Sequence, residues 1–407
     1  MDGARNRRKP RRPRSAARRT RRLWCLPPAV TREPGETLEG MHVLSELPPA
    51  PAHALWTALR DVTLWAATPD ERRPALFTPA AEARRRPEPG EPLDPALEVP
   101  LATLATVVSH AAQASAPVVS LACLDVSKWA RAQGAMGTAV SFAQAAALAS
   151  PDDAQPALAV GRLALQWGRP ARAETWLRRA VGLARRARDW ESYGSACVSL
   201  GEIHLASERL DGAAKYWWLA ARVARRQQLR YVRAEAMHGL MRVSMATGDL
   251  QAAEPYARAA QRAYGRAHPR MPDLRHDMTH LMVRRGEFER VMPLLRRQLG
   301  EVTAPGMRMA ALALQAHAAA ELGDSPLYEQ SWNAAWALKD RPAAAPHLPQ
   351  ALSHLGKAAA RASDWLRVQQ TVRAFDELPP DQRRGPAAAE VAELARLVGS
   401  QRQPHSF

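Results

Sequence analysis

Apolar residues recur at intervals of three and four along most of this chain, which is the spacing of one face of an α-helix. An early case is the segment 53–67, where Leu55, Leu59 and Val62 share a face. Prolines crowd into residues 1–100 and into short gaps further on, where they separate helices without interrupting them. Much of the apolar content is Ala and Leu, whereas Phe and Tyr number only 5 and 6. This mixture favours closely packed helices over sheets, so the pattern predicts an all-α fold.

Small residues recur at fixed steps of 12 and 7 within this helical pattern. Successive anchor positions from 161 to 356 lie 40, 40, 38, 37 and 40 residues apart. Such a period predicts a stack of repeated supersecondary units. The clearest copies are Gly161–Ala173–Ala180, Gly201–Ala213–Ala220 and Met241–Ala253–Ala260, with weaker copies at Ser127–Ala139–Ala146, Thr279, Ala316 and Gly356.

The repeated spacing has a simple physical explanation. Two antiparallel helices approach to about 8–10 Å only where the residues between them are small. We therefore expect Gly161 on one helix to meet Ala173 on the next, with larger side chains such as Leu177 beside them. Glycines such as Gly248 and Gly286 would supply the left-handed residue that ends the first helix.

This pattern resembles the tetratricopeptide repeat (TPR), in which one small residue in the first helix faces two alanines in the second. The resemblance covers about residues 117–382 and implies a right-handed superhelical solenoid of antiparallel helix hairpins. The period exceeds the usual 34 residues, as in long-period bacterial members, and the expected early aromatic of the first helix is absent. Residues 386–400 are expected to form the terminal capping helix that such stacks need.

The chain divides into four predicted regions. Residues 1–40 carry 12 Lys/Arg against 4 Asp/Glu and should form a disordered, arginine-rich tail, for which Met41 offers an alternative start. Residues 41–93 form an N-terminal helical segment and linker, in which Thr68 and Glu71 suggest a capping box. The repeat array follows over residues 94–382, and residues 383–407 hold the capping helix and a tail.

One polar position per repeat is expected to line the concave face, one residue past each anchor, and further polar side chains lie a turn earlier. Most of them are basic or become so on protonation, which suits an extended acidic peptide or a carboxylate-bearing tail. A solvated face without a partner is the alternative. The predicted groove residues are Arg162, Glu202, His238, Arg242, His276, His280, His317 and Lys357.

Histidines in this groove raise two chemical questions. His276 and His280 are spaced i and i+4, the correct reach for zinc, but the sequence fixes no third ligand and lacks the glutamate that follows the first histidine in zinc proteases. We therefore predict no metal. Several imidazoles near arginines instead suggest a groove sensitive to pH.

No signature of an enzyme is present. The sequence lacks a phosphate-binding loop, a dinucleotide fingerprint and a nucleophile elbow, so we expect no catalysis and no cofactor. Three scattered cysteines and the absence of a long apolar run predict a cytoplasmic protein, with Cys123 and Cys197 as buried apolar residues. The leading hypothesis is a scaffold that binds a peptide or helix of a partner protein in the concave groove. A ligand-sensing regulator of transcription or signalling is the alternative, and nucleic-acid binding through the basic tail is the second alternative.

Tryptophan is frequent beside so few other aromatics, at 12 residues. Trp217 and Trp332 fall at packing positions and are expected in the core. Trp218 and Trp336 lie on the neighbouring helical face and are candidates for exposed contacts.

Overall fold

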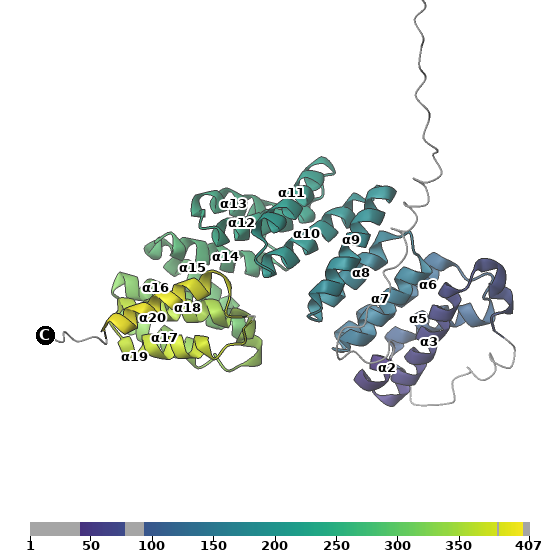
Figure 1. Ribbon diagram of the computed structural model, residues 1–407, viewed down its shortest axis with the longest axis horizontal. Helices are drawn as coiled ribbons and strands as arrows, with labels where there is room; N and C mark the ends of the chain where they lie inside the picture. Colours follow the sequence, from purple (N-terminus) through teal and green to yellow (C-terminus); the bar gives the residue numbers. More distant parts are fainter. Residues whose placement is uncertain (1–40, 78–92, 381, 402–407) are drawn as a thin grey trace, which may run out of the picture. The chain divides into compact units, whose positions relative to one another are not determined.

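The computed structural model describes residues 41–77, 93–380 and 382–401, and within these ranges every regular element is a helix (Figure 1). The predicted arginine-rich tail and most of the predicted linker lie outside the described residues. Contacts divide the chain into unit 1 (Met1–Ile203) and unit 2 (His204–Phe407), with the boundary inside helix α10 (Trp190–Ala206). The four regions expected from the sequence stay a prediction.

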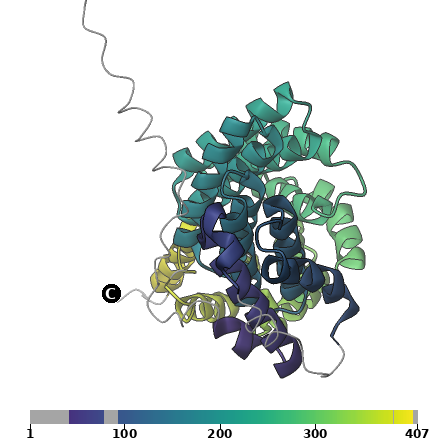
Figure 2. The ribbon, with the colours of Figure 1, turned by 90° about the vertical axis from the view of Figure 1, so that its right-hand side faces the viewer.

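Unit 1 contains two helix hairpins preceded by an N-terminal group of helices. The N-terminal group packs on the first hairpin, through α3 against α7 and α5 against α6 (Figure 2). The bounds are α2 (Met41–Glu46), α3 (Pro49–Ala67), the 3-10 helix η1 (Asp70–Ala75), α5 (Pro95–Ser109), α6 (Ala116–Ala132), α7 (Met136–Ala149), α8 (Ala154–Gln166) and α9 (Pro170–Ala187).

The N-terminal group is part of the core of unit 1. Trp65 is fully buried, and its indole N–H donates a hydrogen bond of 2.8 Å to the carbonyl of Ala111. The carboxylate of Glu46 accepts hydrogen bonds from the backbone N–H groups of Gly137 and Thr138, at 2.9 and 2.8 Å. These are unpaired donors at the start of α7, so the acid caps a helix that lies 91 residues further along the chain.

The capping box predicted at Thr68 is wrong. The Thr68 hydroxyl donates back to the carbonyl of Leu64 at 2.7 Å, which makes this residue the end of α3. η1 follows without a side-chain cap. A threonine hydroxyl can satisfy a carbonyl of the preceding turn or an N–H of the next one, and here the first option prevails.

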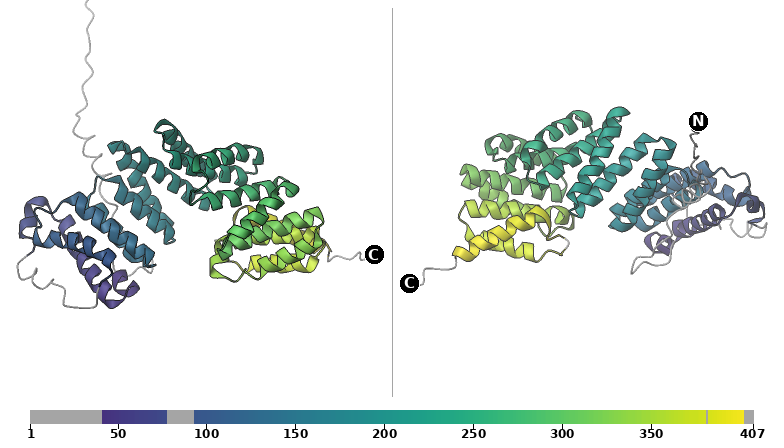
Figure 3. Two further views of the ribbon diagram at one scale, coloured as in Figure 1. Left: turned by 180° about the vertical axis from the view of Figure 1, so that it is seen from behind. Right: turned by 45° about the horizontal axis from the view of Figure 1, so that its top comes forward.

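Unit 2 continues the hairpin pattern and ends with a single helix. Helix α20 packs against α18 and α19, and it corresponds to the capping helix predicted over residues 386–400 (Figure 3). The bounds are α11 (Leu210–Arg226), α12 (Arg230–Ala246), α13 (Leu250–Tyr264), α14 (Met271–Arg284), α15 (Phe288–Glu301), α16 (Pro305–Leu322), α17 (Ser325–Trp336), the 3-10 helix η2 (Pro342–His347), α18 (Leu348–Arg361), α19 (Trp365–Asp376) and α20 (Gly385–Gln401).

The small residues of the repeat lie where helices approach each other. A Cβ atom at Gly161 would stand 2.6 Å from the Leu177 side chain, so the close neighbour is one turn beyond the predicted Ala173. In the first hairpin the Ser127 hydroxyl donates to the carbonyl of Ala139 at 2.7 Å, across the expected pair of positions. The repeat alanines are fully buried: Ala173, Ala180, Ala213, Ala220, Ala253 and Ala260. Gly201 and Gly356 are buried as well.

The turns within the hairpins follow the prediction where glycine is present. Gly248 and Gly286 have φ values of 80° and 73°, in the left-handed region. Other turns place ordinary residues there, among them Glu208 and Ser363, both at φ 57°. These positions carry a small conformational cost that the packed helices on either side must offset.

Candidate functional site

The predicted groove residues differ widely in exposure. Arg162 in unit 1 is exposed, whereas Glu202, Arg242 and Lys357 are half-buried. The histidines of the set lie in unit 2 and are largely enclosed, with exposed fractions of 3% for His238, 5% for His276 and 9% for His280, and 12% for the His317 side chain. Partner binding by the whole set stays a prediction, but the enclosed imidazoles already have partners within the chain.

His238 and Asp277 form a polar pair between α12 and α14. The His238 Nε2 atom lies 2.8 Å from the carboxylate of Asp277, whose side chain is 25% exposed. Burial by itself would raise the pKa of the Asp277 carboxyl. The hydrogen bond with His238 and the charge of the nearby Arg242 outweigh it and hold that pKa well below its usual range.

Four imidazoles from α14, α16 and α18 make up a buried histidine cluster, consisting of His276, His280, His317 and His354. The Nδ1 atoms of His317 and His354 are 3.0 Å apart, and the rings of His280 and His354 meet edge to face with centroids 4.9 Å apart. The side-chain amide of Gln350 lies 2.6 Å from Nδ1 of His280. The cluster thus connects three first helices of successive hairpins.

The histidine cluster is held in the neutral form. Burial lowers the pKa of His280 to about 3 and that of His317 to about 4, and the charge of Lys357 adds to the second effect. Burial also lowers the pKa of His276 and of His354, the latter well below its ordinary value. Desolvation penalises an imidazolium and the imidazoles repel one another once charged, so both causes act in the same direction.

The capping helix occupies the last predicted groove position. The ammonium of Lys357 lies 2.9 Å from the Glu390 carboxylate on α20, and the Ser353 hydroxyl donates to the same carboxylate. Lys357 and Ser353 therefore fasten α20 to α18. Within the described residues, no group of three or more His, Cys, Asp or Glu side chains is arranged to hold a metal ion.

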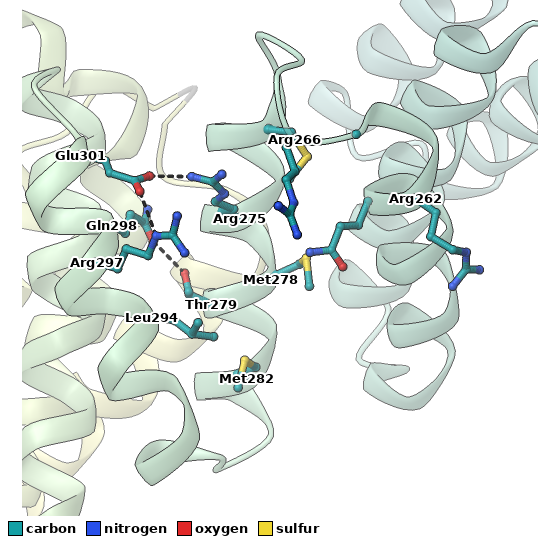
Figure 4. A pocket seen from close by; sticks show the side chains of 13 residues that line it. Arg262, Arg266, Arg275, Met278, Thr279, Met282, Leu294, Arg297, Gln298 and Glu301 are labelled. Carbon is teal, nitrogen blue, oxygen red and sulfur yellow. Dashed lines mark hydrogen bonds and ion pairs between the residues drawn. The ribbon is translucent and has the colours of Figure 1, made fainter.

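A cavity of about 650 Å³ lies elsewhere in unit 2, between α13 and α15 with α14 beneath it. Its apolar lining is dominated by methionine, and its polar lining by arginine (Figure 4). We call it the methionine cavity. Its lining residues are Gln261, Arg262, Gly265, Arg266, Met271, Arg275, Met278, Thr279, Met282, Leu294, Arg297, Gln298 and Glu301.

One acid neutralises one wall of the methionine cavity. The Glu301 carboxylate lies 2.6 Å from the guanidinium of Arg275 and 2.9 Å from that of Arg297, and the hydrogen bond with Arg297 is the main cause that lowers its pKa. Arg266 reaches into the space between α13 and α14, whereas Arg262 points away from it (Figure 4). Within the described part of the chain, Arg266 is exposed and has no carboxylate partner.

The methionines of the cavity and the groove histidines lie on opposite faces of α14, and Gln298 of the lining also contacts His276 at 3.4 Å. Met278 and Met282 follow His276 and His280 by two positions, which is about 200° around a helix. Leu294 is an apolar residue that stays 46% exposed on an otherwise amphipathic helix, and only the structure shows this exposure. Periodicity alone could not separate it from the core residues around it.

Searches among known proteins give a match in fold alone. No family model matches the sequence, and no curated protein matches it. The apo form of RapI aligns with a TM-score of 0.53 at 8% identity, covering 67% of this chain and 99% of RapI. The Rap conjugation regulator of plasmid pLS20, solved in complex with the Phr* peptide, aligns with a TM-score of 0.48 at 12% identity and covers 86% and 99% of the two chains. Yeast Tom70 gives a TM-score of 0.41 at 11% identity, with 95% and 71% covered.

The RapI match and the helix packing agree on the architecture. Helices of the described residues pack consecutively as hairpins within each unit, and none of them has the length and apolar character that crossing a membrane requires. The RapI alignment covers 67% of this chain with a TM-score of 0.53. The chain has the fold of the tetratricopeptide-type helical-repeat solenoids.

Proposed function

We propose that this protein is a non-enzymatic scaffold that binds a short segment of a partner protein in the methionine cavity. The observation that carries the proposal is an arginine without a partner, Arg266, beside an open floor of Met278, Met282 and Leu294. A cavity of about 650 Å³ lies within the size range of ligand pockets and accommodates a few side chains.

The lining determines the chemistry of the segment. Methionine side chains are flexible and polarizable, so they adapt to an apolar residue of a partner. A carboxylate of the same segment would pair with Arg266, and a guanidinium can hold a carboxylate through two parallel hydrogen bonds. The preferred segment therefore joins a large apolar side chain to an acidic one, which retains the acidic character inferred from the predicted groove.

This placement differs from the concave groove expected from the sequence. In unit 2 the predicted groove residues already bind other side chains of the chain: His238 is hydrogen-bonded to Asp277, and Lys357 is ion-paired with Glu390. The arginine-rich tail, which supports the nucleic-acid alternative, lies outside the described residues. No contact or cavity of the described residues favours a sensor of transcription or signalling over a scaffold.

Selection of peptides on the intact protein tests the proposal. A random peptide library displayed on phage would be enriched against the full chain, and the selected peptides measured by fluorescence anisotropy. We expect acidic and large apolar residues close together, and a loss of at least about tenfold with Arg266→Glu or Met278→Asp, as one charge-paired contact is worth about 1.5–3 kcal/mol. Arg185→Glu, on an exposed arginine of α9, is the matched control. Equal affinity for Arg266→Glu, Met278→Asp and the control, with helicity retained, would refute the cavity as the site.

A further inference from the structure

A second hollow in unit 2 has a different chemical character. It occupies about 570 Å³ between α11 and α12, and its lining contains four cations and no acidic residue. Trp218 stands beside it with 51% of its surface exposed, in edge contact with Tyr256 of α13. We call it the basic hollow, and its lining residues are Lys215, Trp218, Leu219, Ala221, Arg222, Arg225, Arg233 and Met237.

The cations of the basic hollow are not neutralised by the protein. Lys215, Arg222, Arg225 and Arg233 are all exposed, and within the described residues none of them has a hydrogen-bonded or ion-paired partner. This contrasts with the other arginine-rich surfaces of unit 2, where Glu254 holds Arg285 and Glu301 holds Arg275. Four like charges kept so near one another cost free energy, which a polyanion would recover on binding.

The arrangement of the cations suits a chain of regularly spaced negative charges. From Lys215 to Arg225 the positive positions follow one face of α11 over about 15 Å, at a rise of about 1.5 Å per residue. Arg233 adds a fourth charge from the neighbouring helix. Guanidinium groups suit phosphate, since they donate two parallel hydrogen bonds to its oxygens.

Trp218 decides between the polyanions. Half of the Trp218 surface is open to solvent, and nucleic-acid bases stack on exposed aromatic side chains without regard to their sequence. Leu219 and Met237 provide an apolar floor beside the ring. A run of carboxylates in a protein segment would use the cations but would leave the indole uncovered.

We propose that the basic hollow binds single-stranded nucleic acid, with a base stacked on Trp218 and backbone phosphates on the four cations. This activity goes beyond the proposed scaffold function and uses none of the residues of the methionine cavity. It is also separate from the basic tail, which belongs to residues 1–40. Binding would be independent of sequence, because the hollow offers charge and an aromatic face but no array of groups to read base edges.

The test uses the full chain and a fluorescein-labelled 12-nucleotide oligo(dT), with anisotropy measured over a range of salt concentrations. Each phosphate held by a cation contributes about −0.7 to the slope of log K against log salt for a single strand. Arg222→Gln/Arg225→Gln should therefore flatten the slope by about 1.4. The control pair Arg131→Gln/Arg185→Gln removes the same charge from exposed positions of unit 1 and should leave the slope unchanged. The basic tail is present in every variant, so a difference in slope between the two arginine pairs comes from the substituted positions.

Trp218 supplies the second measurement. Trp218→Ala should weaken oligo(dT) binding by about 5- to 150-fold, the cost of losing one stacked base, and Trp218→Phe should restore most of the affinity. Circular dichroism checks that both variants remain folded. Equal slopes for the two arginine pairs would overturn the proposal. So would oligo(dT) affinity unaffected by Trp218→Ala, or a decaglutamate peptide that binds as tightly as oligo(dT) and loses as much with Arg222→Gln/Arg225→Gln.

Discussion

The buried histidine cluster should make unit 2 sensitive to mild acid. A free imidazole has a pKa near 6.5, whereas burial lowers the pKa to about 3 for His280 and to about 4 for His317. Between pH 6.5 and 4 the unfolded chain therefore binds protons that the folded chain excludes. The free energy of unfolding is then highest above pH 6.5 and falls as the pH drops toward 4.

The magnitude follows from the distance between the pH and the ordinary pKa. At pH 5.0, about 1.5 pH units below the ordinary pKa of 6.5, each of these two imidazoles stays neutral in the folded chain. Each therefore lowers the free energy of unfolding by about 2 kcal/mol, at 1.36 kcal/mol per unit. Two groups would remove about 4 kcal/mol relative to pH 7.5, a large part of an ordinary domain's stability of about 5–15 kcal/mol. Arg284 and Asp277 also face His280, and their opposite charges oppose each other in this balance.

His280→Gln isolates one of the two contributions, because glutamine stays neutral at both pH values. We expect the variant to lose about 2 kcal/mol less than the natural chain between pH 7.5 and 5.0. His53→Gln, at an exposed position of α3 in unit 1, lies outside the histidine cluster and is the matched control. Hydrogen exchange followed by mass spectrometry on peptides of α14 and α18 measures the effect locally, so overlap with the unfolding of unit 1 does not matter. An NMR titration midpoint of His280 near 6.5, or equal losses in the variant and the natural chain, would refute the reasoning.

The remaining predictions concern packing and burial. A Cβ at Gly239 would stand 2.2 Å from the fully buried indole of Trp217, so Gly239→Ala should lower the free energy of unfolding by about 1–3 kcal/mol. At Gly182 on α9 nothing lies within 4 Å of such a Cβ, so Gly182→Ala should raise the free energy of unfolding by about 0.5–1 kcal/mol. Urea unfolding measures both changes. Glu390→Ala removes the partner of Lys357 and Ser353. It should speed hydrogen exchange in α20 at least about fivefold, since an unpaired buried group costs about 1–3 kcal/mol. Unchanged exchange would contradict the role of Glu390 in holding α20. Burial raises the pKa of Cys197 to about 12 and also raises that of Cys123, so both thiols should react with a disulfide reagent only after unfolding, and rapid labelling of the native chain would show that they are accessible.

Most of the fold could be predicted from the sequence because the strongest constraint is local. Helices must be amphipathic to pack, and small residues must occur where they approach, so the step from Gly161 to Ala173 is visible in the chain itself. The details that failed depend on a choice between equivalent partners. Leu177 rather than Ala173 closes the space over Gly161, and Thr68 bonds backward rather than forward. In the third copy the residue that admits a bulky neighbour is Gly239, two positions before the predicted Met241.

The candidate sites were harder to predict because they depend on contacts between helices distant in sequence. Helical spacing placed His280 on a groove, but Gln350, which lies 70 residues further on, is what its imidazole contacts. The basic hollow combines Lys215 with Arg233 from the next helix. In the sequence these two residues stand among interspersed basic and acidic residues, and nothing there distinguishes them from other surface charges. The tryptophans are a partial success: Trp217 is fully buried and Trp218 is 51% exposed, as their positions on the helix predict, whereas Trp336 is half-buried and stacks on Trp332.

Repeat alanines without exposed surface have a consequence for how this architecture evolves. A few buried alanines fix the spacing of neighbouring helices. The remaining positions are free to change as long as apolar residues stay apolar and polar residues stay polar. The likeness in fold to RapI, at 8% identity over 67% of this chain, is compatible with such freedom at the other positions. Selection for a new ligand then acts on residues whose replacement leaves the framework intact, and binding specificity can change without any redesign of the scaffold.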